Sequence, residues 1–282
     1  MTSTVVVGAG GRTGAYALAW AGEHAATTAA DLVLCYACPA DSAFASADDP
    51  TRLMELHDPA LARAVAELRA RLGGHRVTLR VAAVRPPDLI LAAARSAELV
   101  VVGEPSPVPT GRRETAHRVA AHATVPVVVV RSRGADRSGP FAGHVVIGVD
   151  GSAPSRAALD FGFQEAATHH RPVAAVHVTR DRREDYWFDD DLLSTHFTAE
   201  PAGLDLLAAE TEPWHHRHPD VPIKRAVFAG QPGDGLLRAG AGVALLCVGD
   251  RGRSWPARAL LGSVSDRAVD EADAPVAVVK ER

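Results

Sequence analysis

The chain repeats one pattern of residues at an interval of about 140 positions. An apolar run, a glycine-rich turn and an alanine-rich stretch begin at Thr4 (TVVVGAGGRTGAYALAWA), and the same succession begins again at His144 (HVVIGVDGSAPSRAALDFG). Apolar runs that end in glycine also match, one ending at Gly103 and the other at Gly249. A repeat of this size is a duplicated domain rather than a short solenoid repeat.

Each half of the chain alternates short apolar runs with stretches of helical spacing, such as residues 59–72. The runs are rich in Val, Ile and Leu throughout, which is typical of parallel strands covered on both faces. We expect strands near 4–8, 31–37, 77–82, 98–102 and 126–131, and again near 144–149, 172–178, 222–227, 243–248 and 276–280. The alternation predicts an α/β fold with two doubly wound, parallel, five-stranded sheets in tandem.

The predicted domains cover residues 1–133 and 143–282, joined by a linker rich in glycine, serine and charge. Residues 180–194, which are charged with aromatic insertions, are predicted to form a loop after the second strand of the second domain.

Composition restricts the partners and the compartment. The net charge of −4 is too balanced to favour nucleic acid or a membrane surface, and no apolar run is long enough to cross a bilayer. Three cysteines, Cys35, Cys38 and Cys247, are too few for a disulfide scaffold and fit a reducing compartment. We therefore expect a cytoplasmic protein.

The segment Leu245–Ser265 (LLCVGDRGRSWPARALLGSVS) carries the strongest functional signal. It is a strand-like run that ends at Gly249, followed by Gly252 and, after nine residues, by the pair Gly262-Ser263. Glycines let a backbone approach a ligand closely. Backbone N–H groups at such turns and at a helix N-terminus attract phosphate. The segment therefore predicts an anion site.

This spacing resembles that of the ATP-binding subgroup of the universal stress protein family. Residues 144–162, with Asp150, resemble the opening strand and helix of that family, and residues 273–279 resemble its closing strand. The resemblance implies an adenine-nucleotide alpha-hydrolase-like fold, and ATP, with or without Mg²⁺, as the ligand. It implies that Asp150 lies at the adenosine end and that Val178 packs on the adenine. The full set of binding residues that it implies is Val149, Asp150, Val178, Gly249, Arg251, Gly252, Gly262, Ser263, Val264 and Ser265.

The first half lacks these residues. Gly10 stands where the second half has Asp150, and no Gly-Ser pair follows Gly103 at the required spacing. We expect a degenerate first domain and a nucleotide-dependent stress-response or signalling module rather than an enzyme. By the same resemblance, the two domains are expected to pack through their fifth strands as a pseudo-dimer, and a further homodimer is possible.

Other functions remain open from the sequence. A slow ATPase or phosphotransferase would need an acidic metal ligand, for which Asp250 is the best candidate. The turn Gly8–Gly14 resembles a dinucleotide fingerprint and would suit NAD(P). The Cys35–Cys38 spacing would suit redox chemistry, although these residues lie on or just after a strand rather than at a helix N-terminus.

Overall fold

The structure, a computed structural model of the chain, describes residues 3–11, 13–38, 58–104, 112–131, 139–180, 185–189, 201–252 and 261–281. The chain forms two compact units, residues 1–132 and 133–282. Within the described residues, no helix is both long enough and apolar enough to cross a membrane.

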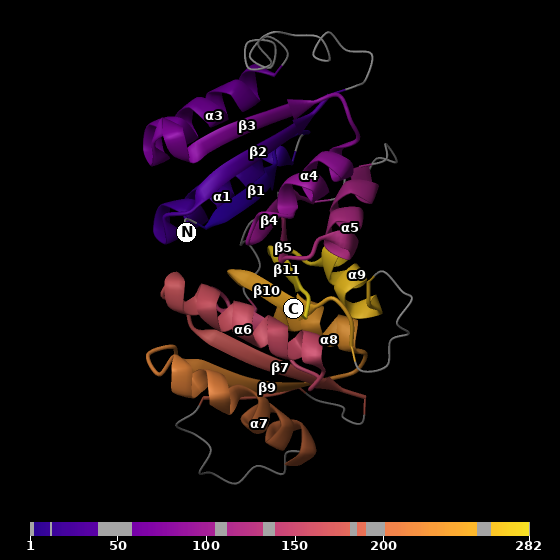
Figure 1. Cartoon of the computed structure of the whole chain (residues 1–282). Coiled ribbons are helices and arrows are strands. Elements are labelled where there is room, and N and C mark those ends of the chain that lie inside the picture. Colours follow the sequence, from indigo (N-terminus) through magenta and orange to yellow (C-terminus); the bar gives the residue numbers. More distant parts are fainter. Residues whose placement is uncertain are drawn as a thin grey trace. The chain divides into compact units, whose positions relative to one another are not determined.

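The first unit is a parallel sheet with strand order β3-β2-β1-β4-β5 (Figure 1). Its elements in chain order are β1 (Thr4–Gly8), α1 (Gly14–Thr28), β2 (Asp31–Ala37), α3 (Pro59–Leu72), the short 3-10 helix η2 (Gly74–Arg76), β3 (Val77–Ala82), α4 (Pro86–Ala94), β4 (Leu99–Gly103), α5 (Arg112–His122) and β5 (Val127–Val130). The five strands predicted for this half are confirmed, with ends that differ by one residue at most.

The second unit repeats this order as β9-β7-β6-β10-β11 and adds a sixth strand beyond β9. Its elements are β6 (Val145–Gly148), α6 (Ala153–Thr168), β7 (Val173–Thr179), β8 (Tyr186–Asp189), α7 (Pro201–Arg217), β9 (Ile223–Ala229), α8 (Pro232–Ala239), β10 (Leu245–Gly249), α9 (Ser263–Glu271) and β11 (Val276–Val279). The doubly wound α/β fold predicted for each half is confirmed.

The prediction of a loop over residues 180–194 is wrong at β8. This strand pairs antiparallel with β9, so that the Tyr186 main chain lies opposite Val227. Asp185, just before β8, accepts a hydrogen bond from the Ala229 N–H (2.8 Å) and forms an ion pair with Arg238 (3.0 Å). These long-range contacts order the start of the strand. Residues 181–184 and 190–194 lie outside the described part of the chain.

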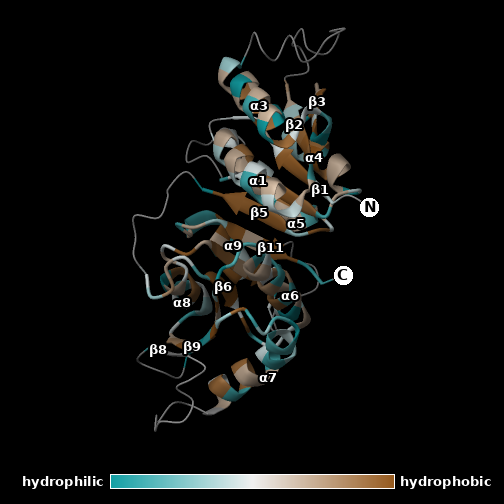
Figure 2. Ribbon diagram, turned by 90° about the vertical axis from the view of Figure 1, so that its left-hand side faces the viewer, coloured by the Kyte–Doolittle hydropathy of each residue, from teal (hydrophilic) through white to brown (hydrophobic). Residues whose placement is uncertain are grey.

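The strands form the core of each unit, and helices cover both faces of each sheet. In the first unit α1 contacts α3 and α4 contacts α5; in the second, α6 contacts α7 and α8 contacts α9. Figure 2 shows the hydrophobic strands between helices that carry most of the hydrophilic residues. Burial is complete at strand centres such as Val6 and Ile147, and each such side chain contributes about 1.5–3 kcal/mol of hydrophobic stabilisation.

Local sequence explains how α6 is placed. Ser152 caps the helix, its Oγ accepting a hydrogen bond from the Ser155 N–H (3.3 Å), and Pro154 occupies the first turn, where a missing N–H costs nothing. Gly162 lets α6 approach the sheet, because a Cβ there would lie 2.5 Å from Ile147 Cδ1. The strand order of this unit reverses between β6 and β10, which is where open α/β sheets bind ligands.

Candidate functional site

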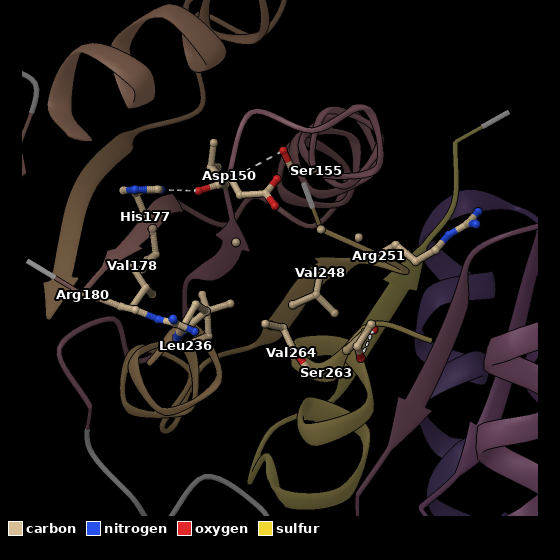
Figure 3. A pocket seen from close by; sticks show the side chains of 18 residues that line it. Asp150, Ser155, His177, Val178, Arg180, Leu236, Val248, Arg251, Ser263 and Val264 are labelled. Carbon is tan, nitrogen blue, oxygen red and sulfur yellow. Dashed lines mark hydrogen bonds between the residues drawn. The ribbon is translucent and has the colours of Figure 1, made fainter. Parts of the chain in front are cut away.

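A cavity of about 320 Å³ lies at the carboxyl ends of β6, β7 and β10 in the second unit (Figure 3). All ten residues that the sequence predicted as a binding site line this one cavity. They come from three segments of the chain, around positions 150, 178 and 249–265. The fold therefore gathers the predicted residues, and ligand contact by each of them stays a prediction.

The cavity is also lined by residues that the sequence reasoning missed. They are Gly148, Ser155, Val176, His177, Arg180, Pro232, Leu236 and Val248. Gly148, Val176, His177 and Val248 lie near the ends of strands that the sequence had already assigned to the site, so the strand assignments could have predicted them. Pro232 and Leu236 come from α8, whose position depends on tertiary packing that no local motif announces.

One wall of the cavity is apolar and tightly packed. It is formed by the end of β7 at Val178 and by Leu236 on α8. Gly235 lets α8 approach this strand, because a Cβ there would lie 2.6 Å from Val178 Cγ1. A Cβ at Gly148 would likewise lie 3.0 Å from Leu236 Cδ1. Such a wall suits the flat apolar face of a ligand ring.

His177 fastens the ends of β6 and β7 together. Its Nδ1 lies 2.8 Å from the carbonyl oxygen of Val149. Because a carbonyl oxygen only accepts, this ring nitrogen must carry the proton. The Val149 carbonyl oxygen thus accepts a hydrogen bond from the His177 imidazole, and this bond holds the main chain that leads into Asp150.

Asp150 follows directly and turns its carboxylate into the cavity region. Oδ1 accepts a hydrogen bond from the Ser152 N–H (2.9 Å), which orients the side chain. Ser152, not Asp150, is the cap residue of α6. A Cβ at Gly252 would lie 2.9 Å from Asp150 Oδ2, so the glycine loop passes directly over this carboxylate.

The other glycines of the loop also have steric reasons to be glycine. A Cβ at Gly249 would lie 2.8 Å from the main chain of Pro154 in α6. A Cβ at Gly262 would lie 3.2 Å from Arg251 Cα and 3.3 Å from the Asp250 carbonyl oxygen. A side chain at Gly262 would therefore press on the start of the loop, which would have to shift by a few tenths of an ångström.

The N-terminus of α9 forms the wall opposite β7. Figure 3 shows Ser263 and Val264 on this side of the pocket, and Val178 and Arg180 on the side of β7. The first N–H groups of a helix have no partner within the helix and carry partial positive charge. Ser263 is exposed, and a hydroxyl beside the first-turn N–H groups is an arrangement that attracts anions.

Ser265 has a different part in this arrangement. Its side chain is 1% exposed, and its hydroxyl lies 2.9 Å from both the Asp250 and the Gly262 carbonyl oxygens. The single hydroxyl proton is already used there. Ser265 thus ties α9 to the end of β10 and has no hydroxyl proton left for a phosphate.

Arg251, which lines the cavity, forms an ion pair with Asp250, which does not. Arg251 Nε lies 3.2 Å from Asp250 Oδ2, and in Figure 3 the Arg251 side chain extends away from the other labelled side chains. Asp250 is 2% exposed and is not among the described residues that line the cavity. Asp250 was the best candidate for the metal ligand of the ATPase alternative, and its burial outside the cavity lining does not favour that role: strand alternation directs it to the opposite side from Gly249.

The strand end of the first unit approaches the start of its own first helix, as Gly249 approaches α6 in the second unit. A Cβ at Gly103 would lie 2.7 Å from both the Cβ and the carbonyl oxygen of Thr13, just before α1. The Thr13 hydroxyl donates to the carbonyl oxygen of Glu104 (3.3 Å). The fingerprint-like glycines serve the turn itself: Gly11 has φ of +80°, and a Cβ at Gly14 would lie 2.5 Å from the Ala9 carbonyl oxygen.

The cysteines of the first unit are buried. Cys35 is 3% exposed and Cys38 is 5% exposed, and both are free thiols. Burial raises the pKa of Cys35 to about 11, although the charge of Arg80 acts in the opposite direction. A thiol with a raised pKa is protonated at neutral pH and is a poor nucleophile. This environment does not favour the redox hypothesis.

Comparisons with known proteins agree with this architecture. The family model for the universal stress protein family matches twice, over residues 1–131 and 142–280, and the chain belongs to this family. A universal stress protein of Mycolicibacterium smegmatis is 34% identical over 205 residues, which cover 68% of this chain and 65% of that protein. One from Mycobacterium tuberculosis is 33% identical over 160 residues, which cover 57% of this chain and 52% of that protein. The chain thus spans between half and two thirds of the length of these relatives.

Solved structures show the same fold over the whole chain. The crystal structure of a universal stress protein from Archaeoglobus fulgidus superposes with a TM-score of 0.66 at 13% identity, covering 99% of this chain and 96% of that one. A putative universal stress protein from Pseudomonas aeruginosa has a TM-score of 0.63 at 16% identity, covering 99% and 93%. At these identities the likeness concerns the fold.

Proposed function

We propose that this chain binds one adenine nucleotide, ATP, in its second unit and acts as a nucleotide-dependent module of a cellular stress response. One observation carries the proposal. Ten residues selected from the sequence as an ATP motif, in segments up to about a hundred positions apart, line a single cavity at the strand-order reversal of a doubly wound sheet.

The walls of the cavity suit the parts of a nucleotide. The adenine ring would pack against the wall formed by Val178 and Leu236, and the ribose would lie near Asp150 and Gly252. The phosphates would then reach the first turn of α9 at Ser263. The cavity has an apolar wall and a few polar groups near one end, which is the usual composition of a small-molecule site.

The steric surroundings of the loop glycines support the proposed site independently of the sequence motif. Cβ atoms at Gly249, Gly252 and Gly262 would press against Pro154, Asp150 and Arg251 respectively. A side chain at Gly249 would meet fixed main chain, and side chains at Gly252 and Gly262 would have to displace the Asp150 carboxylate or shift the loop slightly. Asp150 is the one carboxylate among the described lining residues, so Mg²⁺ would arrive with the phosphates of the nucleotide.

The position of Asp250 favours binding over rapid hydrolysis. Phosphoryl transfer requires groups that hold a metal ion and orient the attacking oxygen near the γ-phosphate. The loop carboxylate that could have done so is buried in an ion pair with Arg251. We therefore infer a binding module in which the nucleotide is retained.

The test is to identify and titrate the nucleotide. The protein is purified gently, any retained ligand is released by heat and identified, and the stripped protein is titrated with ATP, GTP, NAD and adenosine. The proposal expects retained or titratable ATP. Binding of NAD in place of ATP, or no nucleotide binding at all, contradicts it.

The remaining expectations from the sequence stay proposals. They are packing of the two halves through their fifth strands, a further homodimer and a cytoplasmic role. Val128 lies in the middle of β5, and Val128→Asp is expected to lower the melting temperature or to cause misassociation. An unchanged melting curve and an unchanged elution profile would contradict this packing.

A further inference from the structure

An acidic and a basic residue follow equivalent strands in both units. In the first unit Glu104 follows β4 and Arg131 follows β5, and Arg131 Nη1 lies 3.6 Å from Glu104 Oε2. In the second unit Asp250 follows β10 and Lys280 follows β11. Gly249 pairs with Val279 in the parallel register, so Asp250 and Lys280 leave neighbouring strand ends side by side. Burial lowers the pKa of Lys280, and the charge of Asp250 opposes that fall.

The main chain holds both acidic residues in the same way. The Glu104 N–H donates to the Val130 carbonyl oxygen at 2.8 Å, and the Asp250 N–H donates to the Val279 carbonyl oxygen at 2.8 Å. These bonds extend the strand pairing by one residue past Gly103 and Gly249. The acid–base pair is therefore common to both units, including the unit that lacks the nucleotide motif.

The units differ in what the carbonyl group of the acidic residue holds. The Glu104 carbonyl oxygen accepts a hydrogen bond from Thr13 at 3.3 Å. The Asp250 carbonyl oxygen accepts one from the Gly262 N–H at 2.7 Å and one from the Ser265 hydroxyl at 2.9 Å. In the second unit the same residue thus fixes the first turn of α9, at the anion end of the cavity.

The Asp250 carboxylate occupies a costly position. It is 2% exposed, and within the described structure its Oδ1 has no hydrogen-bond partner. A buried carboxylate is expensive unless neighbouring cations compensate it. Arg251 Nε at 3.2 Å and the Lys280 ammonium supply that compensation. Removal of either charge partner should therefore move the residue, and α9 with it.

We propose that Asp250, held by Lys280, is a positioning residue for the phosphate end of the cavity: it fixes the N-terminus of α9 without touching the ligand. The inference rests on the proposed function for its effect on affinity. Its structural part, the coupling of the Asp250–Lys280 pair to α9, is independent of any nucleotide.

The structural part is tested by amide hydrogen exchange on the nucleotide-free chain. Asp250→Asn and Lys280→Met should speed exchange at Gly262 and in the first turn of α9. Glu104→Gln, the matched change in the first unit, should leave those amides unchanged. Lys280→Arg keeps a cation at this position, as the first unit does with Arg131, and should give wild-type exchange. Unchanged exchange at α9 in both disruptive variants overturns the inference.

The functional part is tested by comparing ATP with adenosine. Asp250→Asn and Lys280→Met should weaken ATP about tenfold, the order expected when a charge-supported hydrogen-bonding site is lost. Adenosine, which has no phosphate, should bind as before. Equal losses for both ligands would indicate general disruption and overturn the inference. If the wild type binds no ATP, the proposed function fails, and the exchange experiment still decides the positioning role.

Discussion

The main chain of Gly252 lies against the carboxylate of Asp150, and a Cβ at position 252 would lie 2.9 Å from Asp150 Oδ2. The two residues are about a hundred positions apart, on the strand ends of β6 and β10. In the proposed binding mode this contact joins the adenosine end of the cavity to the loop that leads to its phosphate end. A side chain at position 252 would have to displace the Asp150 carboxylate.

Gly252→Ala should therefore weaken ATP binding. The added methyl group must displace the end of the Asp150 side chain and disturb its hydrogen bond to the Ser152 N–H, which costs about 1 kcal/mol. The measurement is a titration of both single variants and of the double variant with Asp150→Ala. Because the clash needs the carboxylate, Gly252→Ala should cost less when Asp150 is already alanine. Strict additivity would contradict the geometry. Gly74→Ala, where a Cβ meets nothing within 4 Å, is the control.

Two serines of α9 should behave differently although they are two positions apart. Ser263 is exposed at the anion end, so Ser263→Ala should cost about 1 kcal/mol of ATP affinity, the net worth of one hydrogen bond. It should leave the melting temperature unchanged.

Ser265→Ala should instead lower stability by about 1 kcal/mol, because it removes the buried hydroxyl that bonds to the Asp250 or the Gly262 carbonyl oxygen and leaves those oxygens with their main-chain donors alone. Thermal unfolding of both variants in the absence of nucleotide separates the two effects. The reverse order of stabilities would contradict the roles assigned here.

Leu236→Ala tests the apolar wall. The side chain is 6% exposed and packs over Gly148. Its truncation should cost about 2–5 kcal/mol of folding free energy. ATP and adenosine should weaken by the same factor, since both present adenine to this wall. Titration with the two ligands checks this, and a loss confined to ATP would place the base elsewhere.

The buried thiols should resist alkylation in the native protein. Burial raises the pKa of Cys35 to about 11 and raises that of Cys247 well above its ordinary value. Thiolate is therefore scarce at pH 7 and increases only as the pH rises toward those values. Mass spectrometry after brief iodoacetamide treatment should find all three cysteines unmodified without denaturant. Rapid modification of Cys35 or Cys38 at neutral pH would revive the redox hypothesis.

The sequence was sufficient for the parts of the fold that depend on local pattern. Continuous Val-rich runs such as residues 127–130 identify buried parallel strands, and the glycine at the end of a run identifies the turn toward the ligand side. The strand β8 was missed because four residues within a charged segment form a strand only through pairing with β9 and the Asp185–Arg238 ion pair.

The sequence predicted the part of the cavity that the glycine loop forms. It did not predict the parts that depend on side-chain direction and helix packing. The spacing of the glycines predicted that Gly249, Gly252 and Gly262 line one cavity, and all three do. The direction of the Asp250 side chain depends on strand alternation at a single residue, and a one-residue step reverses the face. Leu236 enters the site only because Gly235 lets α8 approach Val178, a tertiary relation that the sequence of α8 alone does not announce.

The central claim is that the second unit alone holds the nucleotide, and isothermal titration of the stripped full chain with ATP tests it most directly. We predict a stoichiometry near one, abolished by Gly252→Val and unaffected by Gly10→Ala in the first unit. Two equivalent sites per chain, or binding that survives Gly252→Val and is lost with Gly10→Ala, would contradict the account.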